Sequence, residues 1–220
     1  MRSLLCVIVI LCANSELVAQ CKEWNWPPDK AKAQEQLALL QDAVRAKQYR
    51  AAVKPLSWLL KTAPTLNVSI YIRGAEVFEG RVVAEKDSTK RAILLDSLLL
   101  LYDLRSNFCD DKANVASRKA MAAFKHMING SQPERVLPLM DEALKLNGGT
   151  MMDAMLLPYM ETLAVMHLKK KMLTEDEILN RYDRLMAIVD EKMKMAKGDK
   201  AKTEKLNGYR AEIDNLLLKV

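Results

Sequence analysis

The apolar positions of the segment 49–64 repeat with the period of an α-helix. Tyr49 is followed by small or apolar residues at +3, +4, +7, +10 and +11, and by Pro64 at +15. These steps fall on one face of a helix, and a proline at this distance lies where the helix should end. The segment therefore predicts an amphipathic helix with one buried face.

The same apolar frame recurs twice further along the chain, at offsets of 40 and 44 residues. The corresponding pairs are Ala52-Val53, Ala92-Ile93 and Val136-Leu137 early in the frame, and Leu59-Leu60, Leu99-Leu100 and Ala143-Leu144 later in it. A helix that recurs in this way predicts stacked helical hairpins, an architecture that binds other molecules more often than it transforms them.

The whole chain favours helix, because Leu, Ala, Met, Lys and Glu dominate it while glycine and proline are sparse. We expect an all-α fold, an α-solenoid of antiparallel hairpins with about nine helices. Their expected ranges are 28–47, 49–63, 68–86, 88–107, 112–129, 133–146, 151–171, 175–196 and 201–218.

Local signals support several of these boundaries. Asn67 is placed to cap the third helix, and Thr174 with Glu177 has the spacing of a capping box before the eighth. Proline residues fall inside three of the expected helices, at Pro55, Pro138 and Pro158. Each removes one backbone hydrogen bond, so it should kink its helix or force it to start late.

The 49–64 segment resembles the second helix of the tetratricopeptide repeat. The matching positions are Tyr49, Ala52, Val53, Leu56, Leu60 and Pro64. In the later copies Thr89 and Pro133 replace the aromatic residue. The spacing also exceeds the usual repeat of about 34 residues, so a regular superhelix is not expected.

A wider resemblance covers most of the chain after residue 20. It rests on Trp24-x-Trp26-Pro27-x-Asp29-Lys30-Ala31, Trp58-Leu59-Leu60-x-x-Ala63-Pro64, Ser97-Leu98-x-x-x-Tyr102-Asp103-Leu104-Arg105 and Asn114-Val115-x-x-Arg118-Lys119-Ala120. These segments look like a family of exported tetratricopeptide-like proteins of the Bacteroidota. The resemblance implies a repeat domain over residues 28–220 and carries no activity with it.

The first twenty residues have the layout of a signal peptide. Arg2 is followed by an uncharged apolar run from Leu4 to Ala13, and Val18-Ala19-Gln20 precedes Cys21. The run is too short to cross a bilayer, which needs roughly 20 residues. We expect cleavage after residue 20, export to the periplasm or outer membrane, and an extended N-terminal arm over 21–27.

Cys21 and Cys109 would remain after cleavage, and three interpretations are open. In an oxidising compartment they are able to form a disulfide that closes a loop of nearly ninety residues. The second interpretation is two unrelated thiols, and the distance between the two cysteines in the fold decides between these two. The third is lipidation of Cys21, for which Gln20 is an unusual preceding residue.

The net charge of +6 is concentrated near the C-terminus. The basic residues there are Lys192, Lys194, Lys197, Lys200, Lys202 and Lys205, with Asp199 and Glu204 among them. They form either a solvated helix end and loop or a contact surface for acidic partners or anionic lipid. Nucleic acid is not expected, because no aromatic residues interleave with these lysines and an exported protein rarely meets it.

No motif indicates catalysis, a cofactor or a metal. His126 and His167 are the only histidines, and the sequence contains no HExxH, GxSxG or glycine-rich phosphate loop. The acidic groups Asp110-Asp111 and Glu175-Asp176-Glu177 precede expected helices, where negative charge suits the helix dipole. We therefore expect a protein that is not an enzyme, with no cofactor.

Three groups of residues remain as candidates for partner contact. A methionine-rich stretch over 151–166 and the Trp24–Trp26 pair are each interpreted as core packing or as a binding surface. The first helix of each hairpin should line the concave face of an array, which nominates Tyr71, Arg73, Arg118, Lys125 and Tyr159. Their aromatic and basic character suits an acidic or C-terminal peptide.

Two functions follow from these patterns. The first is a scaffold that holds a protein or peptide partner in the cell envelope. The alternative is a structural protein of the envelope that is lipid-anchored or bound to the membrane surface through Lys192–Lys205.

Overall fold

A computed structural model describes residues 21–130 and 132–220. Over these residues the protein is all-helical, with nine α-helices and no β-strand, so the predicted all-α fold with about nine helices is confirmed. The helices are α1 (Lys30–Arg45), α2 (Tyr49–Thr62), α3 (Ser69–Ala84), α4 (Ser88–Cys109), α5 (Lys112–Met127), α6 (Val136–Asn147), α7 (Leu156–Ala164), α8 (Glu175–Met195) and α9 (Lys200–Leu217). The expected signal peptide, 1–20, lies outside the described residues.

Side chains cap several helix starts and satisfy backbone N–H groups that have no partner within the helix. Asp29 accepts a hydrogen bond from the N–H of Lys32 at the start of α1. Thr174 and Glu177 form the predicted capping box before α8. At the start of α3, Oδ1 of Asn67 accepts a hydrogen bond from the N–H of Ser69 (2.9 Å).

Two helices, α6 and α7, begin three to five residues later than the sequence predicts, and proline explains both. Short 3₁₀ segments, Pro133–Arg135 and Asp153–Met155, precede α6 and α7. Pro138 and Pro158 each become the third residue of the helix that follows, where the missing N–H costs nothing because it would have no helical partner. Pro55 lies in the interior of α2.

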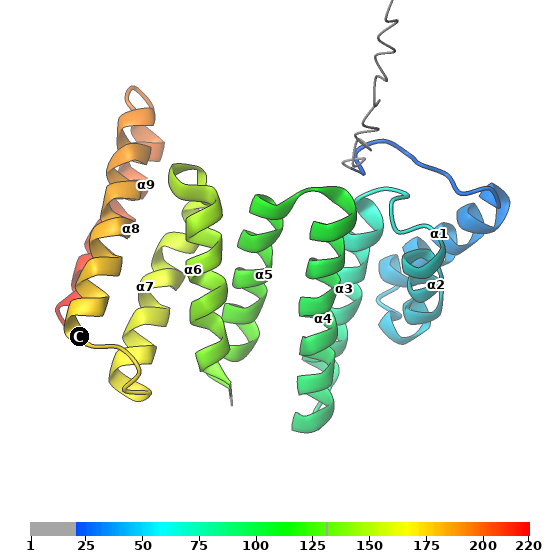
Figure 1. Cartoon of the computed structure of the whole chain (residues 1–220), viewed down its shortest axis with the longest axis horizontal. Coiled ribbons are helices and arrows are strands. Elements are labelled where there is room, and N and C mark those ends of the chain that lie inside the picture. Colours follow the sequence, from blue (N-terminus) through cyan, green and yellow to red (C-terminus); the bar gives the residue numbers. More distant parts are fainter. Residues whose placement is uncertain (1–20, 131) are drawn as a thin grey trace, which may run out of the picture.

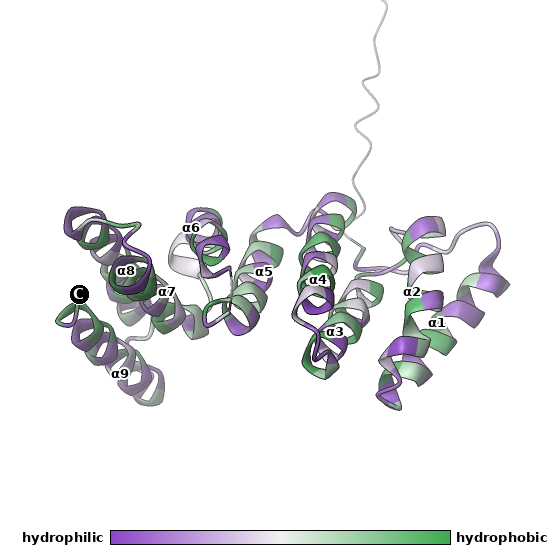
Figure 2. Ribbon diagram, turned by 90° about the horizontal axis from the view of Figure 1, so that it is seen from below, coloured by the Kyte–Doolittle hydropathy of each residue, from purple (hydrophilic) through white to green (hydrophobic). Residues whose placement is uncertain are grey.

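The helices follow one another as antiparallel neighbours in a row, with α1 and α9 at opposite ends (Figure 1). The closest packing is between consecutive helices, and α7 also packs against α9. Hydrophobic residues lie mainly on the faces turned toward neighbouring helices, and hydrophilic residues on the outer faces (Figure 2). The arrangement is that of an array whose elements contact chiefly their neighbours.

The buried apolar residues form three clusters along this row. One occupies α1–α3 and the C-terminal half of α4, with Leu40 and Leu59 fully buried. A larger one extends from Val82 at the end of α3 to Ile213 in α9. A small cluster around Leu98 lies between α4 and α5, and Phe78 of α3 packs against all three.

The N-terminal arm is tied to the first half of the array. Cys21 and Cys109 form a disulfide that joins the arm to the end of α4. The backbone N–H of Val68 donates to the carbonyl of Cys21 (2.8 Å), and the N–H of Asn25 donates to that of Leu66 (2.8 Å). Since the Cys21 sulfur is used in the disulfide, it is not free for acylation in this state.

The two tryptophans of the arm stack on each other, with ring centroids 5.2 Å apart. Trp26 packs against the first core cluster, whereas Trp24 is half-exposed. The pair thus acts mainly in packing and leaves one ring partly in solvent.

Candidate functional site: a groove between α3 and α5

Two of the five predicted contact residues are core residues, which corrects the prediction. Tyr71 is only 2% exposed, and its hydroxyl donates to the carbonyl of Pro64 (2.9 Å). Burial raises the pKa of Tyr71. The prediction assumed that aromatic residues on α3 face the open side of the array, but Tyr71 points into the first core cluster.

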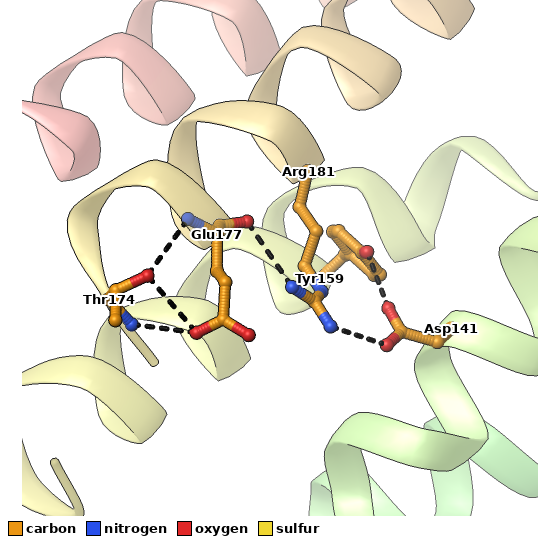
Figure 3. A network of polar contacts seen from close by, with 5 residues as sticks. All are labelled: Asp141, Tyr159, Thr174, Glu177 and Arg181. Carbon is orange, nitrogen blue, oxygen red and sulfur yellow. Dashed lines mark hydrogen bonds and ion pairs between the residues drawn. The ribbon is translucent and has the colours of Figure 1, made fainter. Parts of the chain in front are cut away.

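Tyr159 is likewise buried, at 1% exposure. Its hydroxyl donates to Oδ1 of Asp141 (2.7 Å), while Arg181 contacts Oδ2 of the same carboxylate (3.3 Å) (Figure 3). Burial raises the pKa of Tyr159, and the hydrogen bond to Asp141 adds to this effect. These three side chains join α6, α7 and α8, so Tyr159 stabilises the array and offers no contact surface.

The three basic residues of the prediction are exposed, and two of them lie in one groove. Arg118 and Lys125 come from α5, seven residues apart and therefore on one face of the helix. Arg73 pairs with Glu76 (3.3 Å) beside this groove and does not line it.

The groove lies between α3 and α5 and has a volume of about 580 Å³. We call it the α3–α5 groove. Its lining consists of Ile72, Ala75, Glu76, Glu79, Gly80 and Val83 from α3, Tyr102 and Arg105 from α4, Arg118 and Lys125 from α5, and Tyr49 from α2.

One stripe of α3 forms a wall with apolar ends and an acidic centre. Ile72, Glu76, Glu79 and Val83 follow one another at the spacing of a helix face. Ile72 is 48% exposed and Val83 is 73% exposed. Two exposed β-branched residues on a charged stripe run against the usual sorting of a surface helix, and this is the sequence signal that would have identified the groove.

A glycine shapes the Val83 end of the groove. A Cβ atom at Gly80 would overlap the ring of Tyr49, so glycine permits the tyrosine of α2 to lie against the backbone of α3. The ring of Tyr49, the first residue of the repeat pattern, therefore closes one end of the groove.

Ion pairs connect the walls of the groove. Glu79 of α3 accepts a hydrogen bond from the ammonium of Lys125 on α5 (2.6 Å), and Nε2 of His126 lies 3.9 Å from the same carboxylate oxygen. The His126 ring and then Lys125 lower the pKa of Glu79 to about 2, against the opposing effect of burial. Arg105, which is almost completely buried, pairs with Asp111.

Arg118 differs from the other charged residues of the groove. Its Nε donates to the side-chain oxygen of Asn114 (2.8 Å), a neutral partner. Glu76, Glu79, Arg105 and Lys125 each have an ion pair, but Arg118 has none within the described part of the chain. The groove therefore keeps one uncompensated positive charge.

The lysine-rich segment is exposed except at its first residue. Lys192 is 7% exposed and pairs with Asp153 (2.8 Å), so it belongs to the interior. This corrects the prediction, which placed it with the other lysines in a solvated segment or a contact surface. The other lysines, at 194, 197, 200, 202 and 205, are exposed. Met195 lies among them with 61% exposure.

The remaining candidates mostly pack. The four fully buried methionines of the methionine-rich stretch are Met151, Met155, Met160 and Met166. Nδ1 of His167 lies 2.8 Å from the carbonyl of Leu173. In residues 21–130 and 132–220, no group of three histidine, cysteine or carboxylate side chains is placed to hold a metal ion.

Comparison with protein-family models, curated proteins and solved structures gives no match for the chain. None of the described helices has the length and apolar character needed to cross a membrane. The groove and the exposed surfaces are therefore the features that indicate a function.

Proposed function

We propose that the protein is a non-enzymatic scaffold of the cell envelope that binds a peptide segment of a protein partner in the α3–α5 groove. The observation that carries this proposal is the pair Ile72 and Val83, exposed at the two ends of a charged groove between packed helices. In a groove with charged walls they give a ligand apolar contacts inside a polar rim, the composition of an interaction site.

The dimensions of the groove suit an extended peptide. Ile72 and Val83 are eleven residues apart on α3, which corresponds to about 16 Å along the helix axis. About five residues of an extended chain cover that length. The packing of α3 and α5 against α4 holds the groove in shape, and the Glu79–Lys125 ion pair joins its two walls, which limits the entropy lost on binding.

Export to the periplasm or outer membrane remains part of the proposal. It is supported by the leader-like pattern of residues 1–20 and by the Cys21–Cys109 disulfide, a bond typical of oxidising compartments. The resemblance of the 49–64 segment to a tetratricopeptide helix supports a binding role, because stacked helical hairpins commonly bind other proteins.

Selection from a displayed library of random peptides on the oxidised full chain tests the scaffold proposal. We expect enriched peptides whose binding is lost in the double variant Ile72→Asp/Val83→Asp. The matched control is Ile93→Asp/Leu100→Asp, which changes two exposed apolar residues of α4 that do not line the groove. Peptides that bind equally to the groove variant and the wild type would contradict the proposal.

The exposed lysines favour a second function, contact with an anionic membrane surface. Five exposed lysines surround the exposed Met195 at the connection between α8 and α9. Such a cluster attracts anionic head groups, at about 1 kcal/mol per lysine near the surface. We expect flotation with vesicles of phosphatidylglycerol and phosphatidylcholine in equal parts, lost when the five lysines are changed to glutamine. Flotation that is unchanged by these substitutions would rule this function out.

A further inference from the structure

The position of Arg118 within the groove follows from the packing of α3 and α5. These helices run in the same direction, because each is separated from α4 by one reversal of the chain (Figure 1). The Glu79–Lys125 pair sets their register. Seven residues earlier on each helix, the same register brings Ile72 level with Arg118. The uncompensated cation therefore lies at the end of the groove that also exposes an apolar side chain.

Two residues of α4 add hydrogen-bonding capacity to the groove. Arg105 is held by Asp111, while its Nε has no hydrogen-bond partner among the described residues. Tyr102 lies within electrostatic range of both Arg105 and Arg118, and burial raises its pKa, so its hydroxyl stays a donor at neutral pH. Two guanidinium groups and a phenol thus share the lining of one groove.

We infer that this part of the α3–α5 groove binds the carboxylate of an aspartate or glutamate side chain in an extended peptide, with Arg118 as the residue that selects for it. The inference rests on the proposed function of the groove. An arginine with a free guanidinium edge is the side chain best suited to a carboxylate, because its donors match the two oxygens.

A side chain suits the site better than a chain terminus or a phosphate. Arg118 belongs to α5, which forms a long wall of the groove, so it meets the side of a passing peptide. Glu76 and Glu79 on the opposite wall disfavour a doubly charged phosphate, since one uncompensated cation cannot balance it. A single carboxylate neutralises Arg118 without excess negative charge.

The neighbouring Ile72 defines a second feature of the partner. Because Ile72 is exposed and level with Arg118, an apolar residue next to the acidic one in the peptide would cover it. The expected ligand is therefore an extended segment that carries an acidic residue beside an apolar one.

The test uses peptides enriched on the oxidised full chain and their neutral counterparts, with Asp→Asn or Glu→Gln at each acidic position. We expect one such exchange to weaken binding to the wild type by about five- to tenfold, the range for a partly exposed charged hydrogen bond. In Arg118→Gln that exchange should have no effect, whereas Arg118→Lys should retain part of the preference. Amidation of the peptide C-terminus should leave the affinity unchanged.

The matched control is Arg184→Gln, which removes an exposed arginine of α8 that does not line the groove and should leave the preference intact. Peptides that require Ile72 and Val83 but show no acidic preference would overturn this inference and leave the scaffold proposal standing. A preference that amidation abolishes would also overturn it, because the carboxylate would then be the chain terminus. If no peptide binds in the groove at all, both proposals fail.

Discussion

At the scale of single residues, the pairing of charges decides what the groove offers. Glu79 would make the groove acidic, but the ammonium of Lys125 pairs with its carboxylate. Arg118 has a neutral amide as its partner and keeps its charge available. The basic residues of α5 cannot be told apart by their positions in the sequence. Only their neighbours in the structure show which cation is paired and which is available to a ligand.

Glu79 should make stability depend on pH in the acidic range. Its folded pKa of about 2 lies below the ordinary value of 4.5, so its contribution is complete above pH 4.5 and is lost as the pH falls toward 2. Glu79→Gln should therefore lower the free energy of unfolding at pH 7, and its difference from the wild type should shrink between pH 4.5 and pH 2. Urea denaturation at a series of pH values measures this.

The Lys125→Met background provides the control for that measurement. Without Lys125, the substitution Glu79→Gln should have a smaller effect at pH 7, because the ammonium group that helps to lower the pKa of Glu79 is gone. A difference between Glu79→Gln and the wild type that stays constant down to pH 2 would contradict the prediction.

At the scale of elements, local signals determine where most helices begin, whereas long-range bonds determine where the N-terminal arm lies. The capping box of α8 and the late starts of α6 and α7 need only residues within a few positions of each other. The N-terminal arm is different, since it has no regular secondary structure before α1. Its place depends on the disulfide and on backbone hydrogen bonds to the α2–α3 connection.

Removal of the disulfide should destabilise the protein by about 2–4 kcal/mol, because the bridge closes a loop with a sequence separation of 88 and restricts the unfolded chain. The variant Cys21→Ser/Cys109→Ser and the reduced wild type should show the same loss in urea denaturation. As a control, a reducing agent should not change the stability of the double variant. Equal stability of the oxidised and reduced wild type would refute this role.

At the scale of the whole molecule, the row of helices separates α1 from α9. α1 and α9 share no contact in the row, and the main core clusters meet only near α3 and α4 (Figure 1). In such an array, stability is transmitted from neighbour to neighbour and not across one central core. Local unfolding at one end should therefore leave the other end largely protected.

Leu40→Ala and Leu206→Ala test this division, because both leucines are completely buried, one in α1 and one in α9. Each substitution should cost about 2–5 kcal/mol through lost packing and a cavity. Amide hydrogen exchange should rise most in α1–α3 for Leu40→Ala and most in α7–α9 for Leu206→Ala. Exchange that rises evenly over all helices in both variants would show a single cooperative core instead.

The sequence was a good guide wherever a short stretch of chain decides the outcome. The helical period, the caps and the prolines are properties of neighbouring residues, and they predicted an all-α chain with about nine helices. The sequence predicts Tyr71, Tyr159 and Lys192 at the surface, but all three are buried. A periodic pattern shows that a residue lies on a given face of its helix, but it does not show which neighbour covers that face.

The sequence by itself thus determined the helices and their approximate limits, and it identified the two cysteines able to link the N-terminal arm to the array. The tertiary structure alone decided the groove, because its walls come from helices whose paired residues, Glu79 and Lys125, are 46 positions apart. It also decided which cations are neutralised, as Lys192 is by Asp153 while Arg118 is not. Contacts over such separations depend on how helices pack against each other, and local periodicity carries no information about them.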